Sequence, residues 1–451
     1  MKSGKPSENA FDLMHVDRLP CYPKTLTNKS FTSKNMFIAQ IQKLTPIRAI
    51  CTLVVIGLLA TSSSLVEAAD KENWLGFRGD GTSASSLAPA EIKVGDGGNL
   101  AWKLAMPGKS VAGPIVVGDR VISTSSGGQE GEQLFVTAVS LTTGKKLWEQ
   151  SFRATGRPFC HPTSANAAPS PVSDGERVFA FFSSNDLICL SLEGDFLWYR
   201  GLGFDYPKAG NDIGMASSPI IADGAIIAQV EAQGDSFAIG IDAASGTNLW
   251  RMARPRQSNW SSPVAINRPD DSVEVVMQSG TNIVAVDPRR GNVKWIIEEG
   301  ADKIASGTPA GDYLLLPGSE MMALNIGESA TTPEVSWRNS RLSPRNASAV
   351  LNGERFYSLK GSVLVAGSVK DGEQIWQQRL SGLGGTWATP VASGGRIFIF
   401  DQAGIGLVVE DQGDSAETIM EVDLEEPVLA SPAIANGKLI VRTNQSLFCF
   451  E

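Results

Sequence analysis

The sequence has few of the residues on which metal, haem and nucleophilic chemistry depend. Only 2 of its 451 residues are histidine and only 5 are cysteine. A zinc site needs a cluster of such ligands, and haem attachment needs Cys-x-x-Cys-His, of which Cys160-His161 supplies only the last two residues. The other histidine, His15, lies near the N-terminus. If residues 1–69 are removed as a signal sequence, a Ser-His-Asp triad would have to use His161. We therefore expect no metal site and no catalytic residue, with catalysis by His161 as the less favoured alternative.

Charged residues are also scarce, at 19% of the chain, and the acidic ones outnumber the basic ones. The formal net charge is −9, and without residues 1–69 it becomes −13. A nucleic-acid-binding protein needs a basic face, and docking on anionic lipid needs clustered Lys or Arg. The charge balance therefore argues against both kinds of partner.

One uncharged apolar run, Ala49–Ala60, stands out near the N-terminus. Lys43 and Arg48 precede it and small residues up to Ala69 follow it, an order that is typical of a cleavable secretory signal. The run is too short for a spanning helix. We therefore predict a signal sequence over residues 1–69 and an exported protein, periplasmic or secreted, that is not inserted in a membrane after cleavage.

The polar stretch before this run is longer than secretory signals usually have. Met36 lies 13 residues before Ala49, so we expect Met36 to be the true start and residues 1–35 to be a mis-called extension. No cysteine directly follows the apolar run, since Cys51 lies at its front, and a lipoprotein anchor is therefore not expected. An uncleaved anchor helix remains the alternative.

Three cysteines follow the predicted signal: Cys160, Cys189 and Cys449. Their odd number leaves at least one without an intramolecular partner. Cys160 and Cys189 fall in one repeat, so a disulfide between them stays open. Otherwise we expect these residues to be small buried hydrophobic side chains.

What the sequence does contain is an internal repeat. A glycine stands four residues before a tryptophan at six places, and a seventh tryptophan keeps the same phase without the glycine. The seven tryptophans are Trp102, Trp148, Trp198, Trp250, Trp295, Trp337 and Trp376. Because one tryptophan buries about 150–250 Å², we predict that these seven are structural residues that dock one repeat on another.

A second mark keeps the same spacing. A proline opens an apolar run in seven units, and residues 346–350 (Asn-Ala-Ser-Ala-Val) fill the eighth place. The prolines are Pro114, Pro171, Pro219, Pro263, Pro309, Pro390 and Pro432. Between the two marks each unit has short β-branched runs separated by Gly and Asp turns, which are strand and hairpin signals. Four strands in about 40–50 residues is the period of a propeller blade, with the proline strand innermost and the tryptophan strand outermost.

The two ends of the repeat region predict how the blades close into a ring. The last unit, Ser431–Phe450, supplies three strands, whereas residues 99–102 form a lone fourth strand with no unit before it. Joining the two leaves no open sheet edge. We therefore predict an all-β fold, an eight-bladed β-propeller of four-stranded antiparallel blades over residues 99–451, with an N-terminal segment at 70–98 that packs on it. Seven blades or an irregular eighth remain the alternative, because residues 404–423 lack their tryptophan.

The repeat resembles a known motif. Ala-x-Asp-x-x-x-Gly-x-x-x-Trp is visible at residues 285–295, and variants recur at 240–250 and 138–148. The pattern is similar to the tryptophan-docking repeat of the pyrroloquinoline quinone (PQQ) propellers, and the resemblance spans residues 99–451. A shorter match at residues 73–82 (Asn-Trp-Leu-Gly-Phe-Arg-Gly-Asp-Gly-Thr) resembles the Trp-x-x-Phe-Arg-Gly opening of exported PQQ-like propellers from planctomycete-type bacteria.

Two branches of this superfamily imply different functions. Quinoprotein dehydrogenases hold PQQ and Ca²⁺ in the central funnel with acidic and Asn ligands and often a vicinal disulfide, but this chain has no adjacent cysteines and no clear ligand set. The other branch resembles the periplasmic propeller subunit of the outer-membrane β-barrel assembly machinery, a non-catalytic scaffold that is usually a lipoprotein. The resemblance implies either a scaffold without cofactor, which we favour, or an enzyme with PQQ and Ca²⁺.

The loops that join the outer strand of one blade to the inner strand of the next are expected to open on one face, the funnel face. Trp260 and Trp387 lie on these loops, outside the docking position. Aromatic and Arg side chains that converge on one mouth are typical of ligand and partner sites. The candidate binding residues are Arg157, His161, Asn211, Asp212, Arg256, Trp260, Arg345 and Trp387. Ordinary loop solvation is the alternative for each of them.

We therefore expect a monomeric, exported, non-catalytic binding or scaffold protein that holds a protein partner or a glycan at its funnel face. A PQQ-dependent oxidoreductase is the first alternative. A carbohydrate-binding propeller, in which Trp260 and Trp387 would be stacking platforms, is the second. The functional part of this inference rests on fold analogy, and one fold hosts many functions.

Overall fold

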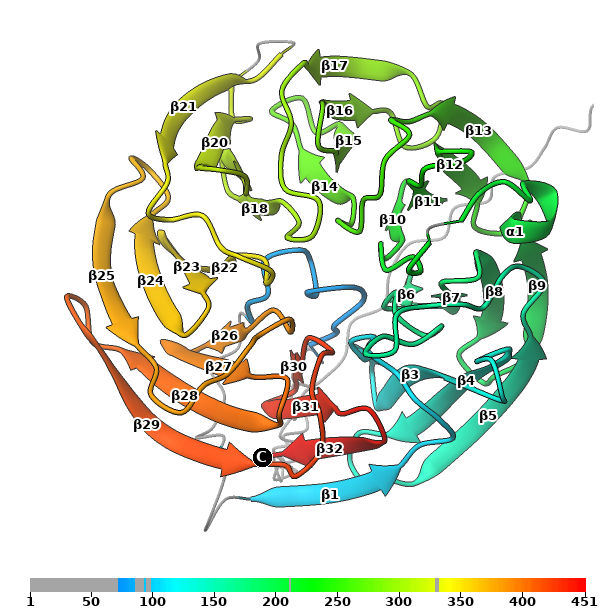
Figure 1. Cartoon of the computed structure of the whole chain (residues 1–451), viewed down its shortest axis with the longest axis horizontal. Coiled ribbons are helices and arrows are strands. Elements are labelled where there is room, and N and C mark those ends of the chain that lie inside the picture. Colours follow the sequence, from blue (N-terminus) through cyan, green and yellow to red (C-terminus); the bar gives the residue numbers. More distant parts are fainter. Residues whose placement is uncertain (1–71, 86–92, 95–98, 211, 329–331) are drawn as a thin grey trace, which may run out of the picture. The chain divides into compact units, whose positions relative to one another are not determined.

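A computed structural model describes residues 72–85, 93–94, 99–210, 212–328 and 332–451 of the chain. They form eight four-stranded antiparallel sheets, arranged as blades around a central axis (Figure 1). The one helix in this part of the chain is the short α1 (Leu202–Asp205), and no described helix is long and apolar enough to span a membrane. The predicted signal sequence lies outside the described residues.

In seven blades the four strands follow one another in sequence from the axis outwards (Figure 1). The first four blades are β2 (Ile115–Val117), β3 (Arg120–Gly127), β4 (Gln133–Ser140) and β5 (Lys146–Arg153); β6 (Val172–Ser173), β7 (Arg177–Phe181), β8 (Asp186–Ser191) and β9 (Phe196–Gly201); β10 (Ile220–Ala222), β11 (Ala225–Val230), β12 (Phe237–Asp242) and β13 (Asn248–Ala253); and β14 (Val264–Asn267), β15 (Val273–Gln278), β16 (Ile283–Val286) and β17 (Val293–Ile297).

The next three blades repeat this order, and the eighth combines the two ends of the propeller. They are β18 (Thr308–Ala310), β19 (Tyr313–Leu316), β20 (Met321–Asn325) and β21 (Glu334–Asn339); β22 (Val350–Asn352), β23 (Arg355–Lys360), β24 (Val363–Ser368) and β25 (Gln374–Arg379); β26 (Val391–Ser393), β27 (Arg396–Phe400), β28 (Ile405–Asp411) and β29 (Ala416–Asp423); and β30 (Ala433–Ala435), β31 (Lys438–Arg442), β32 (Ser446–Phe450) and β1 (Leu100–Ala105).

The ring closes through β1, which pairs antiparallel with β32 and places Leu104 opposite Leu447. The innermost strand β30 contacts β26 on one side and β2 on the other, so the ring of inner strands is continuous. The predicted eight-bladed propeller, closed by the N-terminal strand, is confirmed. The stretch 404–423, which lacks a tryptophan, forms β28 and β29 of a regular seventh blade.

Burial changes across each blade in the way that the sequence requires. The middle strands β7 and β8 are buried along almost their whole length, which explains their continuous apolar runs. The outermost strand β9 is half-exposed, because one of its faces meets solvent and the other packs on the next blade. Apolar side chains from neighbouring blades therefore form the core clusters, as for Val178 of β7 with Val136 of β4.

Five of the seven repeat tryptophans dock on the next blade in one way. The ring of Trp198 lies on Gly246, and its Nε1 donates to the Ala243 carbonyl at 3.1 Å. The others are Trp102, Trp148, Trp250 and Trp337. Gly246 has φ of +71° and a Cβ there would overlap the tryptophan ring, so the docking position requires glycine on two grounds.

Each docking tryptophan also faces a small residue across its own sheet. Cys189 lies opposite Trp198, and Cys449 lies opposite Trp102, and at both places the register shifts next to the pair. A small side chain leaves room for the indole. This explains why Cys189 and Cys449 are buried. Cys160, Cys189 and Cys449 all have free thiols.

Trp295 departs from the docking pattern. Its Nε1 donates to the carboxylate of Glu274 in its own blade at 2.7 Å, because the turn of the next blade lacks the docking glycine. The link to that blade passes instead through Arg268, whose guanidinium donates to the Ile326 carbonyl at 2.9 Å. The position of Trp295 in the repeat did not predict that an arginine, and not the indole N–H, would donate the hydrogen bond to the next blade.

Trp376 also docks without a glycine. Its Nε1 donates to Asp411 of the seventh blade at 3.0 Å, and the Tyr357 hydroxyl donates to the same carboxylate at 2.6 Å. Arg355 forms an ion pair with Asp411 at 3.1 Å. In the seventh blade Met420 stands at the tryptophan position, opposite Val408. A charged cluster thus takes the place of the Gly–Trp contact between the sixth and seventh blades.

Residues 72–85, called the plug below, cross the axis of the ring; they are the blue loop at the centre of Figure 1. Trp74 exchanges two backbone hydrogen bonds with Val116 of β2, at 2.8 and 2.9 Å. At the other end Ala84 forms a β-bridge with Ala392 of β26. The plug therefore satisfies backbone groups that the inner strands turn toward the axis, where no further strand pairs with them.

Candidate binding site in the central channel

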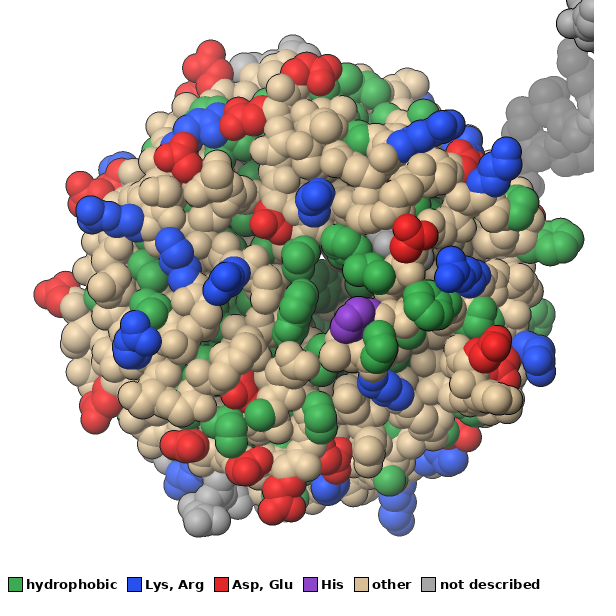
Figure 2. Space-filling view, in the orientation of Figure 1, with side chains coloured by type: hydrophobic (Ala, Val, Ile, Leu, Met, Phe, Trp, Pro, Cys, Tyr) green, Lys and Arg blue, Asp and Glu red, His purple; other side chains and the backbone are tan. Residues whose placement is uncertain are grey.

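The funnel face is hollowed at the axis into a cavity of about 440 Å³. All eight loops that run from an outer strand to the next inner strand contribute to its lining. In Figure 2 hydrophobic side chains and a histidine surround the hollow. The apolar walls come from Ile213, Met215, Trp260, Ile304, Trp387 and Leu429.

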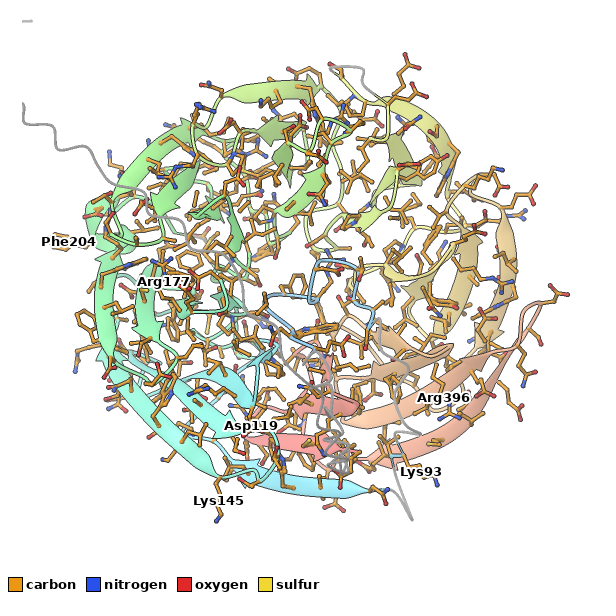
Figure 3. The ribbon with its side chains drawn as sticks, turned by 180° about the vertical axis from the view of Figure 1, so that it is seen from behind. Lys93, Asp119, Lys145, Arg177, Phe204 and Arg396 are labelled. Atoms are coloured by element: carbon orange, nitrogen blue, oxygen red, sulfur yellow. The ribbon has the colours of Figure 1, made fainter. Side chains whose placement is uncertain are left out.

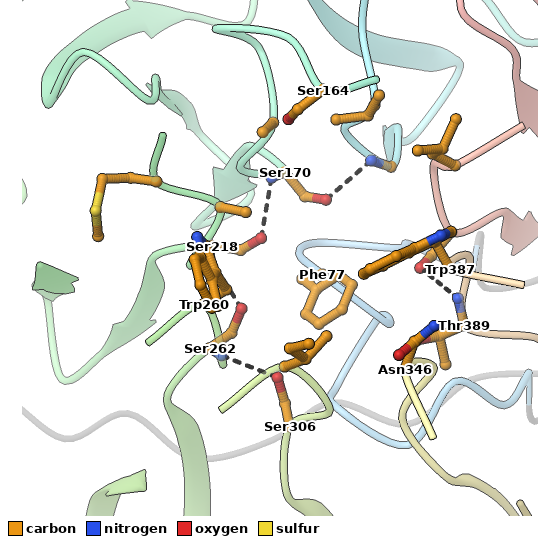
Figure 4. Close-up of a pocket in the computed structure, with 18 of the residues that line it drawn as sticks. Phe77, Ser164, Ser170, Ser218, Trp260, Ser262, Ser306, Asn346, Trp387 and Thr389 are labelled. Carbon is orange, nitrogen blue, oxygen red and sulfur yellow. Dashed lines mark hydrogen bonds between the residues drawn. The ribbon is translucent and has the colours of Figure 1, made fainter. Parts of the chain in front are cut away.

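A belt of hydroxyl side chains surrounds the axis where the inner strands begin (Figure 4). In seven links around the ring, a Ser or Thr hydroxyl accepts a hydrogen bond of 2.9–3.1 Å from the backbone N–H at the matching position of the preceding blade. The hydroxyls belong to Ser170, Ser218, Ser262, Ser306, Ser348, Thr389 and Ser431. The belt thus connects consecutive blades at the narrowest part of the ring.

The eighth position of the belt is Gly113. A Cβ there would lie 2.7 Å from the Ser431 carbonyl and 3.2 Å from the Ser170 hydroxyl, so the first blade has no room for a side chain at this place. The belt side chains are almost completely buried. They therefore add little polar surface to the cavity, and the walls remain mainly apolar.

Phe77 of the plug forms the floor of the cavity. Figure 4 shows its ring between Trp260 and Trp387. The next residue, Arg78, is buried, and its guanidinium carbon lies 5.2 Å from the centre of the Phe77 ring. One face of the phenyl ring therefore covers a cation while the ring also lines the cavity.

Arg78 is held by groups of the fifth blade. Its guanidinium donates to the Thr308 hydroxyl at 2.9 Å and to the Gly307 carbonyl at 2.5 Å. Both acceptors directly follow Ser306 of the belt. Burial lowers the pKa of Arg78 to about 10, and the negative charge of Asp80 opposes this shift. Arg78 thus stays protonated at neutral pH, and its Nε has no hydrogen-bond partner among the described residues.

The two tryptophans of the walls are positioned differently. Trp260 donates from Nε1 to the Gly214 carbonyl at 2.9 Å, and its backbone N–H donates to the Lys303 carbonyl at 2.7 Å. Trp387, in contrast, is 45% exposed. The loop that carries it is tied to Asn346, whose amide donates to the Thr386 carbonyl at 3.5 Å. One wall is fixed by a hydrogen bond of the indole and another of its backbone, and the other presents an open aromatic face.

A buried ionic cluster supports the Trp260 wall. Glu231 accepts from Arg254 at 2.6 Å, from Gln229 at 3.0 Å and from Asn259, the neighbour of Trp260, at 3.0 Å. Burial raises the pKa of Glu231, and the charge of Arg254 with the hydrogen bonds acts in the opposite direction. Because the pair is desolvated and fully bonded, it holds the loop in one conformation and does not act on a ligand directly.

His161 contributes a hydrogen-bond donor to the lining. Its Nδ1 accepts from the Thr163 backbone N–H at 3.3 Å and lies 2.8 Å from the Thr163 hydroxyl. A backbone N–H only donates, so in the neutral ring the proton is on Nε2. Among the described residues, no carboxylate is bonded to this imidazole.

The structure brings together three of the eight candidate residues. His161, Trp260 and Trp387 line the cavity. Four others lie exposed on the funnel loops and are not among the lining residues: Arg157, Asp212, Arg256 and Arg345. The Arg157 guanidinium instead stacks on the ring of Phe159 at 4.8 Å. Asn211 lies outside the described residues.

Sequence reasoning missed the floor and the belt. Phe77 stands in the Trp-x-x-Phe-Arg-Gly stretch, which carried a resemblance and, within the segment 70–98, was predicted to pack on the propeller but not to reach its central cavity. The belt residues are visible in the sequence as the small polar residues that precede the inner strands, such as Ser170 and Ser262. Their spacing in the sequence gave no indication that their hydroxyls bond from blade to blade.

The described lining does not fit PQQ with Ca²⁺. PQQ carries three carboxyl groups, and Ca²⁺ takes about six to eight oxygen ligands, with carboxylates prominent among them. The described lining residues include no Asp, Glu, Lys or Arg. In the described part of the chain there is also no group of three or more His, Cys, Asp or Glu that could hold a metal ion. The donor set of the cavity therefore matches neither partner of this pair.

Comparison with known proteins gives one family and a set of similar folds. A family model described as outer membrane protein assembly factor BamB matches residues 75–228, 136–312 and 326–450. No curated protein matches the sequence. Among solved structures, BamB from Moraxella catarrhalis is 16% identical, with a TM-score of 0.57 over 78% of this chain and 97% of that chain.

Two similar structures are enzymes. A europium-containing methanol dehydrogenase is 11% identical, with a TM-score of 0.63 over 84% of this chain and 98% of that chain. Quinohemoprotein alcohol dehydrogenase from Comamonas testosteroni is 12% identical, with a TM-score of 0.61 over 84% of this chain and 80% of that chain. At such identities these likenesses show the shared fold alone.

Proposed function

Because the chain belongs to the PQQ-like β-propeller family whose model is described as outer membrane protein assembly factor BamB, we propose that it is an exported, non-catalytic binding protein that acts through its funnel face. One observation carries the proposal. Eight loops converge on a single apolar cavity with two tryptophans in its walls and no charged side chain among its described lining residues. Such a cavity is typical of a binding site, and the one titratable residue of its described lining, His161, bonds to Thr163 and to no described carboxylate.

The location outside the cytoplasm is part of this proposal. It is supported by the pattern of charge, apolar core and small residues before Asp70 and by the matching family model, which is described as an outer membrane protein assembly factor. The same description supports a protein as the partner. A carbohydrate, the alternative ligand, would use the same two tryptophans, so the tryptophans alone do not favour either partner.

Site-specific photo-crosslinking tests the binding face. In the test variant, a photoreactive phenylalanine replaces Trp387 in the cavity wall. In the control variant it replaces Lys145, an exposed residue that is labelled in the view from behind (Figure 3). In cells that produce the protein, the residue at 387 is expected to give a discrete crosslinked product and the residue at 145 none. Products from position 145 alone, or from neither position, would contradict binding at the funnel face.

A titration with PQQ and Ca²⁺ distinguishes a PQQ-dependent oxidoreductase from a binding protein without cofactor. The purified protein is heated with PQQ and Ca²⁺, and a ligand that binds the folded state raises the melting temperature according to its concentration and affinity. We expect no shift, because the described lining carries no charge that complements either partner. A saturable shift would favour the PQQ-dependent oxidoreductase and would direct the work to alcohol and sugar oxidation.

A further inference from the structure

We propose that Phe77 is the specificity-determining residue of the cavity: its ring separates a buried cation, Arg78, from the ligand space and so restricts the cavity to uncharged, ring-containing apolar ligands. This inference rests on the proposed function, since it names the ligand class of the same site. It assigns a role to the plug that the tryptophan-docking repeat does not explain.

The plug is fixed to the inner strands at both ends, by Trp74 on β2 and by Ala84 on β26. Between these anchors the chain places Phe77 in the cavity and Arg78 below it, bonded to Gly307 and Thr308. A ligand that enters from the funnel face therefore meets the phenyl ring before it reaches the guanidinium.

Arg78 keeps its positive charge at neutral pH, is 2% exposed, and has an Nε without a hydrogen-bond partner among the described residues. A buried cation attracts an anion strongly when nothing polar or apolar intervenes. The Phe77 ring does intervene, at 5.2 Å from the guanidinium carbon. It offers a ligand an apolar surface where the chain could otherwise present a cation.

The walls are aromatic and aliphatic, and the belt hydroxyls behind them are almost fully buried. A carboxylate placed here would lose its hydration without gaining a charged partner, which is costly. An uncharged aromatic ring loses little and gains contact with Trp260, Trp387 and Phe77. Such a ring is found both in free small molecules and in aromatic side chains of proteins.

The test compares two probes of nearly the same shape, benzamide and benzoate, by isothermal titration calorimetry at pH 7. The wild-type protein is expected to bind benzamide at least about tenfold more tightly than benzoate. Phe77→Ala uncovers the guanidinium and is expected to reverse this preference by about the same factor, because a carboxylate–guanidinium hydrogen bond is worth roughly this much or more. The double variant Phe77→Ala/Arg78→Met is expected to lose the gain for benzoate.

Two further variants serve as controls for the effect of Phe77→Ala on the affinities for benzamide and benzoate. Phe204→Ala removes a phenyl ring that is 77% exposed at the outer edge of the ring of blades (Figure 3) and should leave both affinities unchanged. Trp387→Ala should weaken benzamide. If Phe77→Ala does not fold, as judged by circular dichroism, Phe77→Val replaces it and the same reversal is required of that variant.

The outcomes separate this inference from the proposed function. Benzamide binding without a gain for benzoate in the Phe77 variant overturns the role of Phe77 but leaves the cavity as a binding site. Binding of neither probe to any variant overturns the ligand class, while crosslinking from position 387 still tests the partner-binding face independently. If the wild type binds, a short uncharged peptide with a central tryptophan distinguishes the source: tighter binding than free indole indicates a protein side chain, and equal binding indicates a free ligand.

Discussion

At the scale of single residues, the contact between neighbouring blades depends on glycine. Gly246 combines a left-handed backbone with a direct approach of the Trp198 ring. Gly353 has a similar φ, +63°, but a Cβ there would meet nothing within 4 Å. The two positions therefore separate the cost of the backbone conformation from the cost of losing the docking contact.

We predict that Gly353→Ala destabilises the protein by roughly 1–2 kcal/mol, the cost of the left-handed conformation for a residue with a side chain. Gly246→Ala should cost roughly 2–5 kcal/mol, because the new methyl group must also displace the indole ring. Urea denaturation of both variants and the wild type measures the difference. Equal destabilisation would mean that the Gly–Trp contact contributes nothing beyond backbone strain.

The cysteines give a second residue-scale prediction. Burial raises the pKa of the Cys189 and Cys449 thiols to about 12, and the thiolate is the reactive species. Burial also raises the pKa of Cys160, which is only partly buried. At pH 8 a maleimide should therefore modify Cys160 first in the folded protein, and all three only in guanidinium, as determined by peptide mass spectrometry. Rapid modification of Cys189 in the folded state would contradict the buried position opposite Trp198.

At the scale of elements, β25 and β28 show how two blades stay joined where the repeat degenerates. Asp411 at the end of β28 accepts from Trp376 of β25 and from Tyr357 of β23. Burial alone would raise its pKa, but the hydrogen bonds from Tyr357, Gly413 and Trp376 and the charge of Arg355 outweigh this and lower the pKa below 3.8. The cluster is therefore built for the ionised carboxylate.

The lowered pKa predicts the direction of a pH effect. A carboxyl group whose pKa is lower in the folded state contributes stability above its ordinary pKa, and this contribution is lost as the pH falls through the folded value. Asp411→Asn should therefore destabilise the protein at pH 7, and its difference from the wild type should shrink as the pH falls below about 4. Denaturation at pH 7, 5 and 3 measures this, with the exposed Asp212→Asn as control. A difference that is constant with pH would show that the charge of Asp411 is not what joins the blades.

At the scale of the whole molecule, the plug and β1 join sequence-distant parts of the described chain. β1 completes the last blade, and the plug bonds to the inner strands β2 and β26, which lie on either side of the inner strand β30. Arg78 adds a link to a third, the fifth blade. The ring is therefore held by its own perimeter and by a segment that crosses its centre.

We predict that Arg78→Met loosens this central link. The carbonyl of Gly307 and the hydroxyl of Thr308 lose their donor, which should cost roughly 1–3 kcal/mol. Chymotrypsin should then cut near Trp74 or Phe77 faster than in the wild type, whereas Arg256→Met, a change on an exposed funnel loop, should leave the cutting rate unchanged. Equal cutting of both variants would show that the plug is held by its backbone hydrogen bonds alone.

The number of blades, the places of the docking tryptophans and the closure of the ring could all be predicted from the sequence. They could be predicted because each blade repeats one local pattern, in which turn glycines, β-branched runs and an outer tryptophan follow at nearly constant spacing. The sequence also indicated that Trp260 and Trp387 stand outside that pattern and belong to the funnel loops. Trp295 stands on the outer strand β17, as the repeat predicts, but the repeat did not predict its hydrogen bond to Glu274 in its own blade.

The residues that line the cavity could not be predicted from the repeat. The cavity lining takes one or a few residues from each of eight loops that differ in length and composition, so no periodicity connects them. Its floor comes from Phe77, which lies more than 180 residues from Trp260 in the sequence and reaches the axis only because the plug pairs with the inner strands. Local patterns specify strands and turns; the meeting of distant loops at one axis is a consequence of the closed ring.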